Sequence, residues 1–366
     1  MSKRIYVALD LHPTKIVAMW GEVSEKSKPR KTTLPGDSKG WEDLRKQVGA
    51  HEEIYAVYEA SSCGFVPYDR MTEWGWKAFV LAPTKIRRST RDEKRKNDGG
   101  DTKLLWEQLV AHFELGTELP VVWVPPKKTR EDRELVRHRV WLGEEVTRIK
   151  TKIRSLLLLH GIEEPVDGAK WTKKHRAWLR GLGKDERVGA EVQQVLGSLL
   201  RLLEATEKEG KTASREVEVL AESADYRNQV PAARRTKGIG VLTAMVMATE
   251  LGDVTRFRNR KQVGSYLGVT PTSYESGEAN DRKGHISREG SWRIRKMLNQ
   301  CAWAYIRTHE TERKWYDQLA ERKGPKKAVV AVMRRLGIVV WHHMVEAVLA
   351  ERAHAKAPPS VAPPAA

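Results

Sequence analysis

The strongest constraint on this chain is the stretch Arg4-Ile5-Tyr6-Val7-Ala8-Leu9-Asp10, which predicts a buried strand that ends in a carboxylate. The run is apolar and rich in β-branched and aromatic residues, and a turn signal at His12-Pro13 closes it. A carboxylate loses its hydration when it is buried alone, so Asp10 needs compensation. A divalent cation shared with other carboxylates would supply that compensation.

The pattern that follows predicts a mixed sheet with helices on both faces. It indicates strands over 15–23, 31–34, 54–58 and 76–81, a short helix over 41–48, and a helix that ends near Trp74. Antiparallel strands come first and strand–helix units come later. This order resembles that of the ribonuclease-H-like nuclease fold. In that fold the first strand carries an aspartate and the strand after the first helix carries an acid, and Asp10 and Glu59 occupy those places.

Two further acids come at the start of a predicted helix. The segment 96–102 holds Asp98 and Asp101, which are three residues apart and can share one face at the helix start. Taken alone, Asp98 is read as an N-cap, because aspartate is a favoured cap and suits the helix dipole. Taken with Asp10 and Glu59, the pair predicts half of a metal site.

Electrostatics favour grouping the four acids around a cation. Two carboxylates ~4 Å apart repel by about 4 kcal/mol at an effective dielectric of 20, and four would repel more. Hard oxygen ligands select Mg²⁺, with Mn²⁺ as a second choice, and both ions bind substrate phosphate. Two such ions can activate an attacking oxygen and stabilise the leaving oxygen in phosphodiester cleavage.

The net charge predicts a polyanionic partner. Lysine and arginine total 66 against 48 acidic residues, which gives +18, and a phosphate backbone is the commonest matching partner. The alternative is that the positive charge serves only to keep the protein soluble. Cys63 and Cys301 are too few for a disulfide framework or a four-cysteine zinc site and fit a reducing cytosol. No apolar signal core and no span of ~18 apolar residues is evident, so we expect a soluble, cytoplasmic protein without a membrane partner.

The candidate nucleic-acid contacts fall in three places. A basic segment stands before the two aspartates, a Gly-Ile-Gly turn resembles a helix–hairpin–helix turn that binds phosphate through backbone N–H groups, and a later loop carries further basic residues. A solvated linker and an ordinary glycine turn are the alternatives for the first two. The candidate residues are Lys85, Arg87, Arg88, Arg91, Arg95, Lys96, Lys237, Gly238, Gly240, Arg282, Lys283 and Arg288.

The middle of the chain predicts a coiled-coil-like antiparallel helical hairpin. One long helix is predicted over 129–160 and a second over 188–220. Their seams are Val146, Ile149, Ile153, Leu156 and His160 on the first helix and Val188, Val192, Val195, Leu199 and Leu202 on the second. Leu196, Leu200 and Leu203 are a surplus apolar face, which would bury either a second protomer's hairpin or part of the same chain.

We therefore predict an α/β ribonuclease-H-like domain over 1–125, a helical hairpin over 126–225, a mainly α-helical domain over 226–352 and a disordered Pro/Ala-rich tail over 353–366. The last third is predicted to hold a loop rich in serine, glycine and basic residues, a helix from Ser291 through Trp303, and helices broken at Gly324-Pro325. A loop serine is a turn former or a phosphate ligand, and no His-Asp partner marks a triad nucleophile.

These residues together resemble the insertion-sequence transposases with a DEDD tetrad, the bridge-RNA-guided recombinases. The resemblance covers nearly the whole chain. It is carried by Ala8-Leu9-Asp10-Leu11-His12, Tyr58-Glu59-Ala60, Lys96-Asn97-Asp98-Gly99-Gly100-Asp101, Gly268-Val269-Thr270-Pro271, Tyr274-Glu275-Ser276-Gly277-Glu278 and Ile286-Ser287-Arg288-Glu289-Gly290.

The resemblance implies a RuvC-like catalytic domain, a coiled-coil spacer and a C-terminal transposase domain with a nucleophilic serine. It makes the four acids the metal ligands and Ser276 the nucleophile. The family often has two adjacent serines before the glycine, and Glu275 replaces the first here, so Ser273 and Ser287 follow as second and third candidates. It also implies DNA, a structured guide RNA and a homo-oligomer, dimer or tetramer. A metal-dependent endonuclease of the Holliday-junction resolvase type and a non-catalytic nucleic-acid scaffold are the alternatives.

Overall fold

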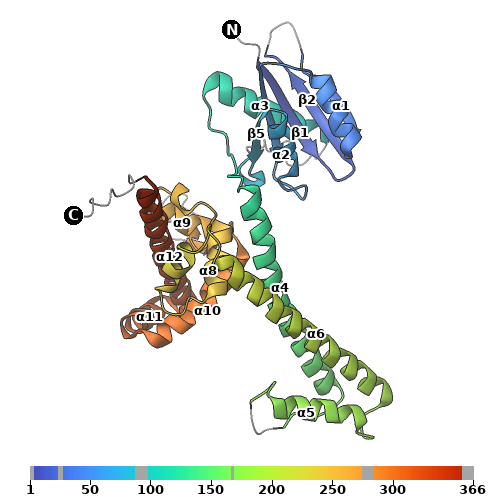
Figure 1. Cartoon of the computed structure of the whole chain (residues 1–366), viewed down its shortest axis with the longest axis vertical. Coiled ribbons are helices and arrows are strands. Elements are labelled where there is room, and N and C mark those ends of the chain that lie inside the picture. Colours follow the sequence, from blue (N-terminus) through green and yellow to red (C-terminus); the bar gives the residue numbers. More distant parts are fainter. Residues whose placement is uncertain (1–3, 24–27, 87–97, 166–168, 274–282, 357–366) are drawn as a thin grey trace, which may run out of the picture. The chain divides into compact units, whose positions relative to one another are not determined.

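A computed structural model of the chain shows two compact units, Met1–Val124 and Pro125–Ala366 (Figure 1). The structure describes residues 4–23, 28–86, 98–165, 169–273 and 283–356. The division falls directly before Pro125, where the prolines Pro125-Pro126 interrupt the regular structure.

The first unit is built on a five-stranded mixed sheet in the order β3-β2-β1-β4-β5. The strands are β1 Arg4–Leu11, β2 Lys15–Gly21, β3 Arg30–Pro35, β4 Glu53–Glu59 and β5 Lys77–Leu81. β2 pairs antiparallel with β1 and β3, whereas β4 pairs parallel with β1 and β5. The mixed sheet predicted from the sequence is confirmed, and β1 lies at its centre.

Helices cover both faces of this sheet (Figure 1). Helices α1 (Ser38–Val48) and α2 (Val66–Glu73) pack on one face, and α3 (Asp98–Leu115) packs on the other. A short 3₁₀ turn, η1, spans Pro83–Lys85. Because both faces of β1 are covered, its side chains are buried without alternation, which explains the continuous apolar run in the sequence.

The second unit contains a long helical hairpin. Helix α4 (Lys127–Leu159) and helix α6 (Ala190–Ala221) run antiparallel, because Arg139 contacts Ser214 while Lys150 lies 3.1 Å from Glu207. Helix α5 (Lys173–Gly181), followed by η2 (Leu182–Lys184), packs against the hairpin through Leu179 and Leu182. The sequence pattern did not predict α5, since its nine residues are mostly basic and only two are buried.

The inward face of α6 differs from the predicted seam. Leu196, Leu200 and Leu203 are buried inside the hairpin of the same chain, whereas Val195 is 45% exposed and Leu202 53% exposed. The two sets are adjacent stripes on one helix, shifted by a single residue. Hydrophobic periodicity marks both stripes as apolar, and only the packing of α4 and α5 decides which one turns inward.

The remaining helices surround α8 (Val241–Leu251), in which every residue from Thr243 onward is buried. They are α7 (Gln229–Arg234), α9 (Arg260–Tyr266), α10 (Trp292–Thr308), α11 (Glu310–Lys323) and α12 (Pro325–Lys356), with η3 (Val254–Arg256) after α8. The predicted break between α11 and α12 is present, and Gly324 adopts a positive φ of 84° there.

A small two-stranded sheet lies where the sequence predicts only a loop. β6 (Pro271–Ser273) pairs antiparallel with β7 (Lys283–Ile286). Strands of three and four residues are too short to show a periodic pattern, so these two could not be recognised from the sequence.

The base of the hairpin is built into the core around α8. Val136 and Val140 of α4 are buried in that core together with Val217 of α6. Arg133 donates from Nε and Nη2 to the Thr249 carbonyl oxygen at 2.9 and 2.8 Å, and burial lowers the pKa of Arg133. The guanidinium thereby satisfies a carbonyl oxygen near the end of α8 and fixes α4 against it.

The expectation that no stretch is apolar enough to span a membrane is wrong at one helix. Between Pro325 and His354, α12 has the length and the apolar composition that a membrane-spanning helix needs. Its residues Val332, Leu336 and Val340 are buried in the core around α8. A core helix passes the same test as a membrane span, so this helix is weak evidence for a membrane.

Candidate active site

Strand register places the first two acids next to each other. β1 and β4 pair in parallel from Arg4 with Glu53 through Leu9 with Tyr58. The next position in this register sets Asp10 beside Glu59, at the carboxyl ends of neighbouring strands whose backbones lie about 4.8 Å apart. Both residues are half-buried. Because side chains alternate along a strand, both belong to the face that α3 covers.

Helix α3 brings the third acid to the same edge. Phe113 of α3 packs on Tyr55 with ring centroids 4.1 Å apart, so this end of α3 lies over the beginning of β4. From Phe113 back to Asp101 the helix covers about 18 Å, and from Tyr55 to Glu59 the strand covers about 13 Å. The first turn of α3 therefore reaches the carboxyl edge of the sheet.

The inward stripe of α3 includes the position of Asp101. Leu105 and Leu109 are buried against the sheet, and Asp101 lies one turn before Leu105 on the same stripe. Asp98 is the first residue of α3, three positions before Asp101, and its side chain lies outside the described part of the structure. Backbone geometry therefore brings Asp10, Glu59 and the first turn of α3 toward one end of the sheet, and a site shared by all four acids stays a prediction.

The carboxylates are not gathered around one point. Among the described side chains, no group of three or more histidine, cysteine, aspartate or glutamate residues is close enough to hold a metal ion. His12 lies beside the first acid, with its Nε2 atom 3.3 Å from Asp10 Oδ2. The donor set still fits Mg²⁺ chemically, since adjacent carboxylates offer the hard oxygen ligands that this ion prefers. Convergence on a shared ion stays a prediction.

Two of the predicted serines, Ser273 and Ser287, adjoin the small sheet of the second unit. Ser276, the first candidate, lies outside the described residues. Ser273 is the last residue of β6, and the structure describes its backbone but not its side chain. Ser287 follows β7, where its N–H donates to the Thr270 carbonyl oxygen at 2.9 Å. Its hydroxyl is buried and makes no hydrogen bond within the described part of the chain.

Two glycines fix the base of this serine-bearing loop. Gly268 has a φ of 66°, and its carbonyl oxygen accepts from the N–H of Arg288. A Cβ on Gly290 would lie 1.7 Å from the Tyr266 carbonyl oxygen, so only glycine fits there. Arg295 donates to the Gly290 carbonyl oxygen at 2.6 Å, and its burial together with nearby Arg288 lowers the pKa of Arg295. Both glycines stand in the motifs that carry the family resemblance, but only the structure shows what each does for the backbone.

The predicted glycine turn lies between two helices. Gly238 has a φ of 90° and Gly240 is the N-cap of α8, so the segment joins α7 to α8 through a tight turn. Lys237 is exposed beside it. The segment is thus a turn between two helices, and both its resemblance to a helix–hairpin–helix turn and its binding of phosphate stay predictions.

Only some of the basic residues predicted to contact nucleic acid lie in the described part of the chain. Lys85 is exposed at the end of η1, and Arg288 is exposed with a φ of 56°. The side chain of Lys283 in β7 is not described. The other basic candidates of the two loops, Arg87, Arg88, Arg91, Arg95, Lys96 and Arg282, lie outside the described residues.

The mixed sheet β3-β2-β1-β4-β5, with acids at the carboxyl ends of β1 and β4, has the strand arrangement predicted for a ribonuclease-H-like domain. Residues 7–162 match the model of the DEDD transposases of the IS110 type, and residues 231–317 match the model described as "Transposase IS116/IS110/IS902 family". The first match contains the four acids and the second contains the three serines. The chain therefore contains two domains of the IS110/IS116 type of DEDD transposase.

Relatives along most of the chain support this assignment. The protein named "Putative transposase y4qE" of Sinorhizobium fredii is 28% identical over 79% of this chain and 65% of its own length. The protein named "Putative transposase y4rJ" of the same organism is 29% identical over 86% of this chain and 83% of its own length. The "Transposase for insertion sequence element IS1533" of Leptospira borgpetersenii is 23% identical over 83% of this chain and 86% of its own length.

Proposed function

We propose that this protein is the transposase of an insertion sequence and that it cuts and rejoins DNA strands. The observation that supports the proposal is the strand register: the β1–β4 pairing sets Asp10 beside Glu59, and α3 packs on the face of the sheet to which both belong. The family match supports metal-dependent chemistry at this edge, since DEDD transposase domains typically depend on a divalent metal.

The four acids Asp10, Glu59, Asp98 and Asp101 are proposed to hold Mg²⁺, with Mn²⁺ as a substitute. When bound, the ion polarises the scissile phosphate. The four acids, on β1, β4 and α3, would hold the ion at the carboxyl edge of the sheet. Holding these carboxylates close together without a cation would cost repulsion energy, and the ion removes that cost.

A serine is proposed as the nucleophile. Its Oγ forms a bond to phosphorus while the bond from phosphorus to the leaving sugar oxygen breaks, and the leaving oxygen takes a proton. The phosphoserine ester keeps the energy of the broken bond, so a second strand can reverse the step and be rejoined. Ser276 is the first candidate, followed by Ser273 and Ser287.

The partners follow from charge and family. DNA is the proposed substrate, and the net charge of +18 favours binding of phosphate backbones. A structured guide RNA, a homo-oligomer and a cytoplasmic location are further parts of the proposal. The exposed Val195 and Leu202 stripe on α6 supports association of hairpins.

Separate substitutions of the serine and of the first acid distinguish strand transfer from plain hydrolysis. We expect Ser276→Ala and Asp10→Ala each to reduce strand exchange on paired DNA sites by about a hundredfold or more. Asp43→Ala, in α1 on the opposite face of the sheet, is the matched control and should leave exchange unchanged. Exchange is measured by gel analysis of labelled DNA, with the guide RNA added.

The rival functions predict other outcomes in the same assay. Full strand exchange by Ser276→Ala, with loss in Asp10→Ala, would support a metal-dependent resolvase that does not use this serine. Binding that is equal with Mg²⁺ and with chelator, without cleavage under either condition, would support a non-catalytic scaffold.

A further inference from the structure

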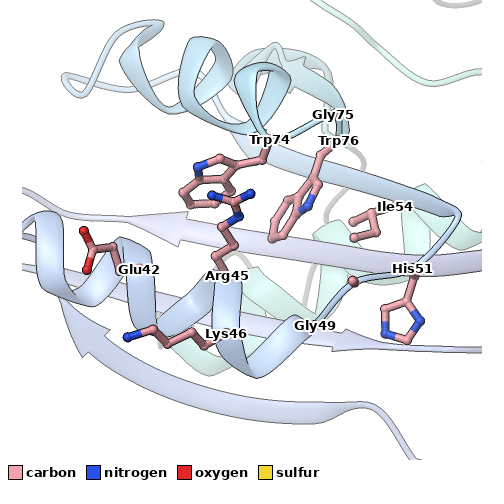
Figure 2. A pocket seen from close by; sticks show the side chains of 10 residues that line it. Glu42, Arg45, Lys46, Gly49, His51, Ile54, Trp74, Gly75 and Trp76 are labelled. Carbon is pink, nitrogen blue, oxygen red and sulfur yellow. The ribbon is translucent and has the colours of Figure 1, made fainter.

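A recess in the first unit is separate from the acidic edge. It lies between α1, the start of β4 and the turn after α2, and its volume is about 620 Å³ (Figure 2). This volume is in the range of small-molecule and cofactor sites. The lining residues are Glu42, Arg45, Lys46, Gly49, Ala50, His51, Ile54, Trp74, Gly75 and Trp76.

Local sequence patterns build the recess. Helix α1 buries Trp41, Leu44 and Val48 against the sheet, which leaves Arg45 and Lys46 exposed. The chain then leaves the helix at Gly49, whose φ of 81° is in the left-handed region. Gly75 turns the chain in the same way between Trp74 and Trp76, with a φ of 83°.

The two tryptophans form the apolar wall of the recess. Trp76 is only 5% exposed, whereas Trp74 is half-buried and keeps part of its indole open. Their rings meet edge to face, with centroids 5.1 Å apart and planes at 69°. Figure 2 shows both indoles extending from the turn toward α1. The edge-to-face contact holds Trp74 in place, so a ligand would meet a preset aromatic surface.

Positive charge lies over the half-buried indole of Trp74. The Arg45 guanidinium lies over this ring, 5.6 Å from its centroid. Figure 2 shows Arg45 reaching from α1 toward Trp74. Lys46 and His51 line the recess with it, and Glu42 is the single carboxylate among the lining residues. An indole face with two exposed cations fits a ligand that is both aromatic and anionic.

We propose that this recess binds one unpaired nucleotide of a nucleic-acid strand, with the base stacked on Trp74 and the phosphate held by Arg45 and Lys46. This inference rests on the proposed function in one respect only, the choice of nucleic acid as the class of partner. Single strands are recognised in this way, by stacking on aromatic side chains beside a cationic surface. Bases within a duplex stack on each other and do not offer this face.

The recess is distant from the reacting phosphate. It opens at the beginning of β4, beside Ile54, on the α1 side of the sheet, whereas Glu59 ends the same strand and faces α3. Five residues of strand span about 17 Å. The bound nucleotide is therefore an anchor that orients the strand, and it takes no part in cleavage.

The test measures binding of fluorescent oligonucleotides to the full-length chain in chelator, where no cleavage is needed. The probes are a single-stranded RNA, a single-stranded DNA of the same sequence and the matching DNA duplex. We expect Trp74→Ala to weaken binding of at least one single strand about five- to a hundredfold, which corresponds to the loss of one stacked base. Trp74→Phe should keep most of the affinity. Of the two single strands, RNA or DNA, the one whose affinity falls more with Trp74→Ala is identified as the natural occupant of the recess.

Controls separate this recess from general electrostatics and from misfolding. Arg45→Ala should weaken single-strand binding more than Lys39→Ala, a change on the same helix outside the recess. Circular dichroism checks that each variant is folded. Unchanged single-strand affinity in folded Trp74→Ala, or an equal loss on the duplex, would overturn the proposal. The binding assay contains chelator and involves no cleavage. A negative result would therefore rule out this recess as a binding site without contradicting the proposed metal-dependent strand exchange.

Discussion

At the scale of residues, Tyr6 fixes α3 to the sheet that carries the candidate acids. Its hydroxyl donates to the Glu114 carboxylate, and its ring lies 5.9 Å from that of Phe113. Burial, followed by the Glu114 contact, raises the pKa of Tyr6 to about 12. This contact holds the far end of α3, so it also sets how far the first turn extends over the acidic edge.

The raised pKa of Tyr6 predicts an alkaline loss of stability. The folded state holds the phenolic proton more tightly than the unfolded state, where the pKa is about 10. The stabilisation is therefore complete below about pH 10 and is lost as the pH rises toward 12. We expect Tyr6→Phe to lower the free energy of unfolding by about 1 kcal/mol near neutral pH. The difference from the wild type should shrink between pH 10 and 12 in urea titrations.

Tyr68→Phe in the same unit is the matched control for this pH effect. Tyr68 lies on α2, on the opposite face of the sheet. A stability difference between Tyr6→Phe and the wild type that stayed constant up to pH 12 would contradict the proposed role of the Tyr6–Glu114 contact.

At the scale of elements, the helical hairpin depends on one stripe of α6. Leu203 is fully buried between α6 and its partners, while Leu202 next to it is 53% exposed. The two leucines have the same helix propensity, so any difference between them reports burial alone. Substituting each leucine in turn therefore compares the buried stripe of α6 with the exposed stripe at neighbouring positions.

We predict that Leu203→Ala destabilises the protein by about 2–5 kcal/mol, because it leaves a cavity in a packed core. Leu202→Ala should stay within about 0.5 kcal/mol in dilute protein, since it removes exposed surface. Urea unfolding followed by circular dichroism measures both. Equal losses at the two positions would show that α6 turns a different face to α4.

Repeating the measurement for Leu202→Ala at several protein concentrations extends this prediction. A loss of stability that grows with protein concentration would indicate that the outward stripe is buried in an oligomer, since assembly stabilises the folded state by mass action.

At the scale of the whole molecule, net charge governs binding of nucleic acid. A surplus of 18 positive charges attracts phosphate backbones and releases their counterions on binding. We predict that affinity for duplex DNA falls about a thousandfold between roughly 50 and 200 mM salt if six or more phosphates are neutralised. Fluorescence anisotropy at stepped salt concentrations measures the slope. A flat salt dependence would contradict binding through a basic surface.

Much of the fold followed from the sequence because its signals are local. The apolar run before Asp10, the strand before Glu59 and the break at Gly324-Pro325 each depend on neighbouring residues, and each lies where it was predicted. The strands β6 and β7 and the helix α5 were missed, because short or strongly basic segments carry little periodic signal.

The sequence by itself determined which residues carry chemistry: acids at strand ends and a helix start, a basic surplus, and a serine-rich loop. Only the tertiary structure decided which of these meet. The β1–β4 register set Asp10 beside Glu59, and the packing of α3 turned the stripe that contains Asp101 toward the same face of the sheet. Packing also joined Arg45 to Trp74 across a recess. Periodicity reports only on neighbours along the chain, whereas a site forms from long-range contacts that all of the core must satisfy together.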